Sequence, residues 1–87
     1  MENLIDQYVS VNASVCHGKP CFKGTRIMIY IILEMLGSGA STKEIQEAYP
    51  DLTPTHIKAA LHYAARVLEK REFDPSFLKE EDEVFNR

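Results

Sequence analysis

Several features that define particular classes of protein are absent from this chain of 87 residues. It holds only two cysteines, Cys16 and Cys21, which cannot supply the four ligands of a structural zinc site and should stay reduced without a secretion signal. Its main apolar run, residues 27–33, is far shorter than the ~20 residues that a membrane-spanning helix needs. The N-terminus carries Glu2 and Asp6 instead of a basic leader. We therefore expect a cytoplasmic protein with no membrane span, disulfide, metal or cofactor.

Motifs of catalysis are missing as well. The sequence has no Gly-x-Ser-x-Gly elbow and no phosphate-binding loop. Cys16 and His17 are neighbours on a segment that we expect to be extended, which turns their side chains to opposite faces. His56 and His62 are six residues apart, or roughly 240° around a helix, so they cannot share a ligand site. Because no nucleophile or acid–base pair stands out, we do not expect an enzyme.

Length and charge distribution predict one small domain followed by an acidic tail. A monomer of this size buries only roughly 60–65% of its unfolded surface, so formation of a homodimer would add stability. Residues 1–72 balance eight basic side chains against eight acidic ones, whereas residues 73–87 hold two basic and five acidic ones. We therefore expect a neutral domain over residues 1–72 and an acidic tail over residues 73–87.

The N-terminal part of the domain has the pattern of a β-hairpin arm. Residues 8–11 alternate with period two, as in a half-buried strand. Residues 17–26 contain two glycines and a proline, which flank a short extended pair, Cys21 and Phe22. Because two strands alone are marginally stable in water, the arm must pack on helices or pair with another chain. Of these two arrangements we favour pairing across a dimer.

Three helices are predicted after the arm. The first covers residues 28–36, which are almost entirely apolar, and it ends at a Gly-Ser-Gly stop. Its apolar character on nearly every side requires cover from two directions, one of which could be a partner subunit. The second helix begins at a capping box formed by Ser41 and Glu44, and it is terminated by Pro50.

The third helix is the longest. It starts at Thr53, an N-cap hydroxyl, followed by Pro54 at the first helical position. An apolar stripe at helical spacing is expected to face the core and consists of Ile57, Ala60, Leu61, Ala64 and Leu68. The outward positions are Thr55, Lys58, Ala59, His62 and Arg66. The predicted fold class is therefore mainly α: a β-hairpin arm, a three-helix, helix-turn-helix-like bundle and an acidic C-terminal tail.

A short helix, a tight turn and a longer amphipathic helix form the layout of a helix-turn-helix, whose second helix lies in the major groove of DNA. Side chains near its start could contact phosphates and base edges, and basic side chains of the arm could add phosphate contacts. The candidate DNA-binding residues are Lys19, Lys23, Arg26, Lys43, Thr53, Thr55, His56, Lys58 and His62. Two alternatives stay open: a plain three-helix core without a nucleic-acid role, and an arm whose charges only protect a strand edge.

The acidic tail carries large apolar side chains among its carboxylates. It could dock on a partner protein, with carboxylates that mimic the phosphate charge a nuclease expects and apolar side chains that fill pockets. The candidate partner-binding residues are Phe77, Leu78, Glu80, Glu81, Asp82 and Phe85. In the alternative interpretation, the apolar anchors fold back on the domain itself.

Several blocks of the sequence closely resemble the domain of unknown function 433 family. The blocks are Gly18-Lys19-Pro20-Cys21-Phe22-Lys23-Gly24-Thr25-Arg26-Ile27, Tyr49-Pro50-Asp51-Leu52-Thr53 and Ile57-Lys58-Ala59-Ala60-Leu61-His62-Tyr63-Ala64, and the resemblance runs from about residue 14 to residue 65. It implies a bacterial or archaeal protein with a homeodomain-like or winged-helix-like trihelical fold behind a β-hairpin. Cys21 departs from the pattern, because the family usually has an aliphatic residue there.

The resemblance also implies a function. Such proteins are often predicted to be DNA-binding antitoxins that are encoded beside a nuclease toxin of the PIN type. This implication agrees with the division of the chain into a helix-turn-helix and basic arm for operator DNA and an acidic tail for a PIN-like toxin. The alternative is a protein-interaction module that dimerises and presents its tail without binding DNA.

Overall fold

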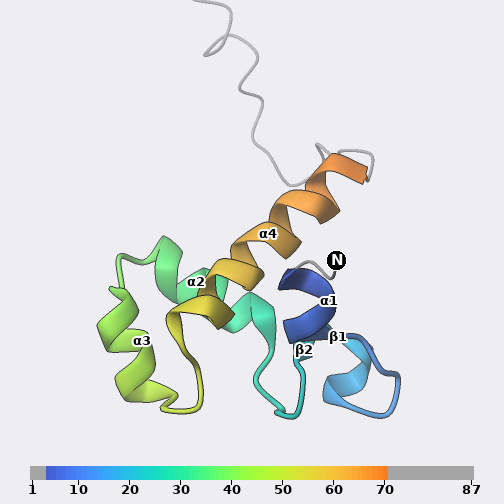
Figure 1. Ribbon diagram of the computed structural model, residues 1–87, viewed down its shortest axis with the longest axis horizontal. Coiled ribbons are helices and arrows are strands. Elements are labelled where there is room, and N and C mark those ends of the chain that lie inside the picture. The colour runs from blue at the N-terminus through green and yellow to red at the C-terminus, as the bar shows by residue number, and fades with distance from the viewer. Residues whose placement is uncertain (1–3, 71–87) are drawn as a thin grey trace, which may run out of the picture.

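The computed structural model describes residues 4–70 as four helices and a two-stranded antiparallel sheet (Figure 1). In chain order the elements are α1 (Leu4–Tyr8), β1 (Val9–Ser10), the 3-10 turn η1 (Cys16–Gly18), β2 (Cys21–Phe22), α2 (Ile29–Gly37), α3 (Thr42–Ala48) and α4 (Pro54–Lys70). The predicted mainly α fold, with a small hairpin ahead of three helices, is confirmed. Within residues 4–70, no helix has both the length and the apolar character needed to cross a membrane.

Helix α1 is absent from the sequence prediction, which placed a strand over residues 8–11. Tyr8 instead closes α1, and the strand is confined to Val9–Ser10. The helix packs along α4, and Ile5 contacts the core cluster. Because an isolated helix of five residues is unstable in water, α1 depends on this tertiary packing, which local periodicity does not reveal.

The hairpin is part of the core and not a separate arm. Val9 pairs with Phe22, and Ser10 pairs with Cys21, in antiparallel register within one chain. Val9 and Phe22 are buried, and both belong to the same cluster as the helix residues Ile32 and Ile45. The strands therefore obtain their cover from helices of their own chain, so the favoured expectation of pairing across a dimer is not needed to explain their stability.

The connection between the strands is a left-handed turn, so the expected extended segment at Cys16 and His17 is wrong. These residues have φ angles of 55° and 56°, in the left-handed region of backbone conformation that residues other than glycine seldom adopt. The Cys16 thiol donates a hydrogen bond to the Arg26 carbonyl over 3.3 Å, which ties the turn to the next loop. Both cysteines are buried, and burial raises the pKa of the Cys21 thiol, which disfavours its reactive thiolate.

Helices α2 and α3 begin as their sequences predict. The Ser41 hydroxyl accepts from the Glu44 amide over 3.1 Å, and the Glu44 carboxylate accepts from the Ser41 amide over 2.8 Å, which completes the capping box. Helix α3 has one buried residue, Ile45, which joins Ile32 of α2 in the core.

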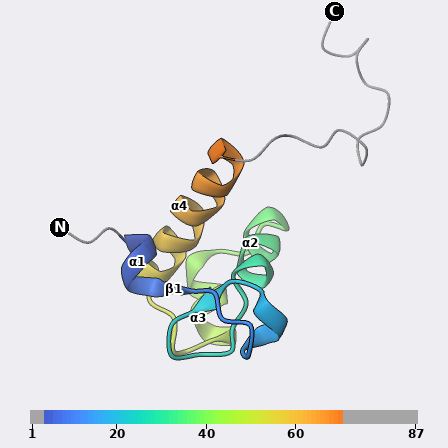
Figure 2. The same cartoon turned by 90° about the vertical axis from the view of Figure 1, so that its right-hand side faces the viewer.

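Two predictions about which residues of α4 are buried are wrong. Ile57 and Ala60 are buried as expected, but Leu61 and Leu68 are 51% and 60% exposed. Ala59 was expected to face outward and is fully buried, because α1 and β1 pack on α4 in addition to α2 and give it a second buried face. Both views show the C-terminal part of α4 projecting beyond the other helices (Figures 1 and 2), which leaves part of the apolar stripe open to solvent.

Candidate nucleic-acid interface

Helices α3 and α4 follow one another with a short turn between them, which is the layout that the sequence predicts for a helix-turn-helix. The Tyr49 amide still bonds to the Ile45 carbonyl over 2.8 Å, and the Leu52 amide bonds to the Tyr49 carbonyl over 3.0 Å. Leu52 is fully buried, so the turn is held by the core as well as by its backbone. Pro50 follows the last turn of α3 and prevents that helix from continuing.

The start of α4 and the basic loop lie at the same end of the molecule. Figures 1 and 2 share a vertical axis, and in both the α3–α4 turn and the loop of residues 23–28 lie at the lower end. The C-terminal end of α4 lies at the upper end in both views. Lys23 and Arg26 belong to this loop, so the fold brings part of the predicted basic arm to the end of α4 that a helix-turn-helix presents to DNA.

A polar stripe runs along the outer face of α4 from this end. Thr55, Lys58 and His62 recur at i, i+3 and i+7, which places them on one side of the helix. Lys58 and His62 are exposed, and Thr55 is partly buried. Arg66 continues the stripe four residues after His62, and the two side chains help line a shallow hollow of about 510 Å³ beside α1. Arg66 is absent from the predicted DNA-binding set, although its spacing from His62 could have identified it.

Three cations of the predicted basic cluster are exposed but contact different parts of the chain. The Lys19 ammonium lies 5.3 Å from the centroid of the Tyr30 ring, and the Lys23 ammonium donates to the Asp6 carbonyl. Arg26 lines a hollow beside η1. A lysine has three N–H donors, so Lys23 can bind a phosphate while it keeps its bond to Asp6. Lys43 is exposed on α3.

His56 does not face outward as a base-contacting residue does. Its Nδ1 atom accepts a hydrogen bond from the Thr53 amide over 3.0 Å, and its own amide donates to the Thr53 hydroxyl over 3.3 Å. The imidazole packs edge-on against the rings of Tyr8 and Phe22, with centroid distances of 4.7 and 5.5 Å. Thr53 and His56 thus form a reciprocal cap of α4, in which the histidine takes the place that glutamate has in a capping box.

The burial of His56 in this cap makes the stability of the domain sensitive to pH. Burial lowers the pKa of His56 below its ordinary value of 6.5, and the nearby Asp51 carboxylate opposes this effect only in part. The folded state therefore binds fewer protons than the unfolded state, and stability falls as pH drops through about 6.5 toward the lower folded pKa. We expect the midpoint of urea unfolding to decrease over this range, and we expect His56→Gln to flatten that decrease. His62→Gln, at an exposed site on the same helix, should keep the wild-type pH profile; an equal flattening by both changes would contradict the assignment.

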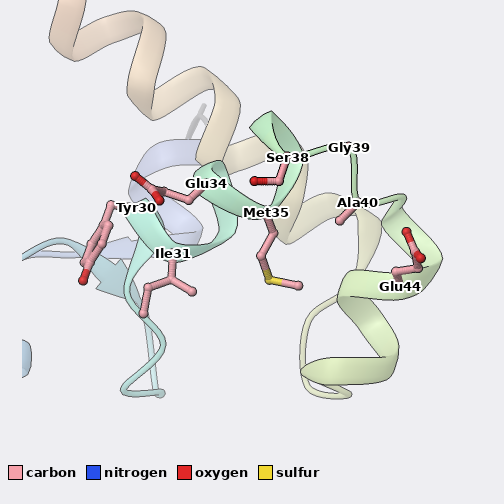
Figure 3. Close-up of a pocket in the computed structure, with 8 residues that line it drawn as sticks. All are labelled: Tyr30, Ile31, Glu34, Met35, Ser38, Gly39, Ala40 and Glu44. Atoms are coloured by element: carbon pink, nitrogen blue, oxygen red, sulfur yellow. The ribbon is translucent and has the colours of Figure 1, made fainter.

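A hollow of about 610 Å³ lies between α2 and α3 (Figure 3). Figure 3 shows Met35 pointing into this space, while Glu34 and Glu44 project from different helices and do not converge. The Glu44 carboxylate is already engaged in the cap of α3. Over residues 4–70, no group of three histidine, cysteine, aspartate or glutamate side chains is placed to hold a metal ion. The predicted tail residues lie outside the described range.

These elements define a small, mainly helical protein with a hairpin built into its core. The chain belongs to the DUF433 family, described as proteins of unknown function, whose family model matches residues 9–64. It is similar to the crystal structure of a DUF433 member from Anabaena variabilis, with a TM-score of 0.68 and 28% sequence identity. The match covers 77% of this chain and 66% of that chain. Comparison with curated proteins finds no match.

Proposed function

We propose that the protein is the antitoxin of a toxin–antitoxin pair, a cytoplasmic homodimer that binds operator DNA and neutralises a PIN-like nuclease toxin. The observation that carries the DNA-binding half is the position of the basic loop at the same end as the start of α4. In a helix-turn-helix, that end of the second helix approaches the base edges while flanking cations contact phosphates. The family is shown by the match over residues 9–64, but its description assigns no activity.

The roles within the interface follow from exposure. Lys58 and Thr55 lie on the outward stripe of α4 and can reach the major groove, and Arg66 extends the basic character of that stripe. Lys19, Lys23, Arg26 and Lys43 supply phosphate contacts. Thr53 and His56 act through the cap that orients the first turn of α4, and they position the interface without touching DNA. This assignment narrows the base-reading surface to the outer stripe.

The test is binding of the full chain to a duplex that carries the promoter of its own gene, measured by fluorescence anisotropy across a salt series. Changing Lys19, Lys23 and Arg26 to alanine should weaken binding and reduce the steepness of its salt dependence. Each lost phosphate contact removes about 0.9 from the slope of log K against log salt, so the slope should fall by up to about 3 per bound protomer. Lys70→Ala, near the opposite end of α4, should leave the slope unchanged. An unaltered slope in the triple variant would exclude the basic loop from the interface.

A second candidate is a protein-interaction module that dimerises and presents its tail without binding DNA. Its support is the neutral body, in which eight basic side chains balance eight acidic ones over residues 1–72. The contacts of Lys19 with Tyr30 and of Lys23 with Asp6 also give these cations a structural use. The two functions predict different dimers, because DNA binding requires the two α4 helices about 34 Å apart with both basic loops on one side.

A further inference from the structure

An apolar groove separates α2 from the C-terminal half of α4. Its volume is about 230 Å³, and Leu68 and Tyr30 on its walls are 60% and 50% exposed. The groove also contains Leu33, Tyr63, Ala64 and Val67. Apolar surface of this kind is expected to bind another apolar group, because its removal from water is favourable.

We propose that this groove is the docking site of the chain's own C-terminal segment, with Phe77 and Leu78 seated between α2 and α4. The family match, which ends at residue 64, assigns no role to this groove. Of the proposed DNA contacts, Lys19 lies beside the groove, over the Tyr30 ring, so the docked tail and DNA would compete for this lysine. Phe77 and Leu78 occupy the groove in the free protein, and a toxin that binds the same side chains has to displace them first.

The position of the groove along the chain supports this occupant. Leu68 lies two residues before the end of α4, and residues 71–87 follow directly. Pro75 cannot continue a helix and disfavours helical geometry at Asp74, so the chain must leave the axis of α4 before Phe77. The wall from Tyr63 to Leu68 is about 7.5 Å long at 1.5 Å per residue, which two or three extended residues can span. The first apolar pair after the proline therefore falls within reach of the groove.

Charge complementarity supports the same occupant. Tyr30 forms part of the groove wall, and the Lys19 ammonium lies over its ring on the exposed surface. The acidic residues Glu80 to Asp82 begin two positions after Leu78. When Phe77 and Leu78 occupy the groove, these carboxylates come within reach of Lys19. The tether also favours the chain's own segment over a separate molecule, because a short linker gives an effective concentration in the millimolar range.

A tryptophan reporter tests the docking, because the natural chain contains no tryptophan. In full-length Phe77→Trp we expect emission at shorter wavelength and weaker quenching by acrylamide than in a free peptide of residues 73–87 with the same change. Adding Leu68→Lys should return both properties to the values of the peptide. Leu61→Lys is the matched control, because Leu61 is 51% exposed on the same helix and does not line the groove. Circular dichroism verifies that both lysine variants keep their helices.

The unlabelled chain provides a second measurement. Chymotrypsin should cleave after Phe77 about tenfold faster in Leu68→Lys than in the wild type or in Leu61→Lys, because cleavage follows the population of the undocked segment. Peptide-like emission in full-length Phe77→Trp, or shielding that Leu68→Lys leaves intact, would overturn the proposal. Shielding that disappears on dilution would also overturn it and assign the groove to a second copy of the chain. Neither DNA nor toxin is present in these assays, so their outcome is independent of the proposed function.

Discussion

Replacing Phe22 with alanine is expected to destabilise the domain by about 3–5 kcal/mol, the range for removing a large aromatic side chain from a packed core. Phe22 is fully buried, and its ring also packs against His56 at the start of α4. The change therefore leaves a cavity and weakens the support of the α4 cap. Because small domains have marginal net stability, we expect most of the variant to be unfolded at 37 °C.

Urea unfolding monitored by circular dichroism measures this loss. Val11→Ala is the control, because Val11 follows β1 directly and is 62% exposed. It should change the unfolding free energy by less than about 0.5 kcal/mol. If Phe22→Ala cost no more than Val11→Ala, the hairpin would be an independent arm, and its place in the core would be wrong.

Local chemistry predicts the helices that carry their own start and stop signals. The Ser41–Glu44 capping box, Pro50 and the Thr53–Pro54 pair each act within a few residues, and the structure places the boundaries of α3 and α4 beside them. Helix α1 has no comparable signal and is stabilised by α4, which lies far away in sequence. Ala59 was assigned outward but is fully buried in a helix that α1, β1 and α2 all contact, and α1 is not predicted from the sequence.

The apolar stripe of α4 shows a second limit of periodicity. Spacing identifies Ile57, Leu61 and Leu68 as one face, but it does not indicate how far along that face the rest of the domain extends. Leu68 is exposed near the end of the helix, but Leu61 is exposed although Tyr63 and Val67 beyond it are partly buried, so the buried face of α4 is also turned away from the predicted stripe. At the predicted DNA-binding site, Thr53 and His56 were chosen by proximity to the helix start, whereas their mutual hydrogen bonds depend on backbone geometry that forms only in the cap.

If the protein is the antitoxin that we propose, removal of residues 74–87 is expected to abolish neutralisation of its PIN-like toxin while the fold and operator binding persist. The deletion removes five of the thirteen acidic residues and the apolar anchors Phe77, Leu78 and Phe85, but none of the buried residues that form the described core. We expect the truncated chain to leave nuclease activity uninhibited at concentrations where the full chain inhibits it completely. Circular dichroism spectra and promoter binding of the two chains should be similar.

Two variants of the full chain separate the contributions of charge and apolar contact. Changing Glu80, Glu81 and Asp82 to their amides should slow association with the toxin and reduce its salt dependence, because these carboxylates mimic the phosphate charge that a basic nuclease cleft attracts. Changing Phe77, Leu78 and Phe85 to alanine should instead accelerate dissociation, since apolar anchors in pockets determine how long a complex lasts. Surface plasmon resonance with immobilised toxin resolves the two rates. Full neutralisation by the truncated chain would show that the tail is not part of the toxin interface. The toxin would then have to bind the domain that precedes the tail.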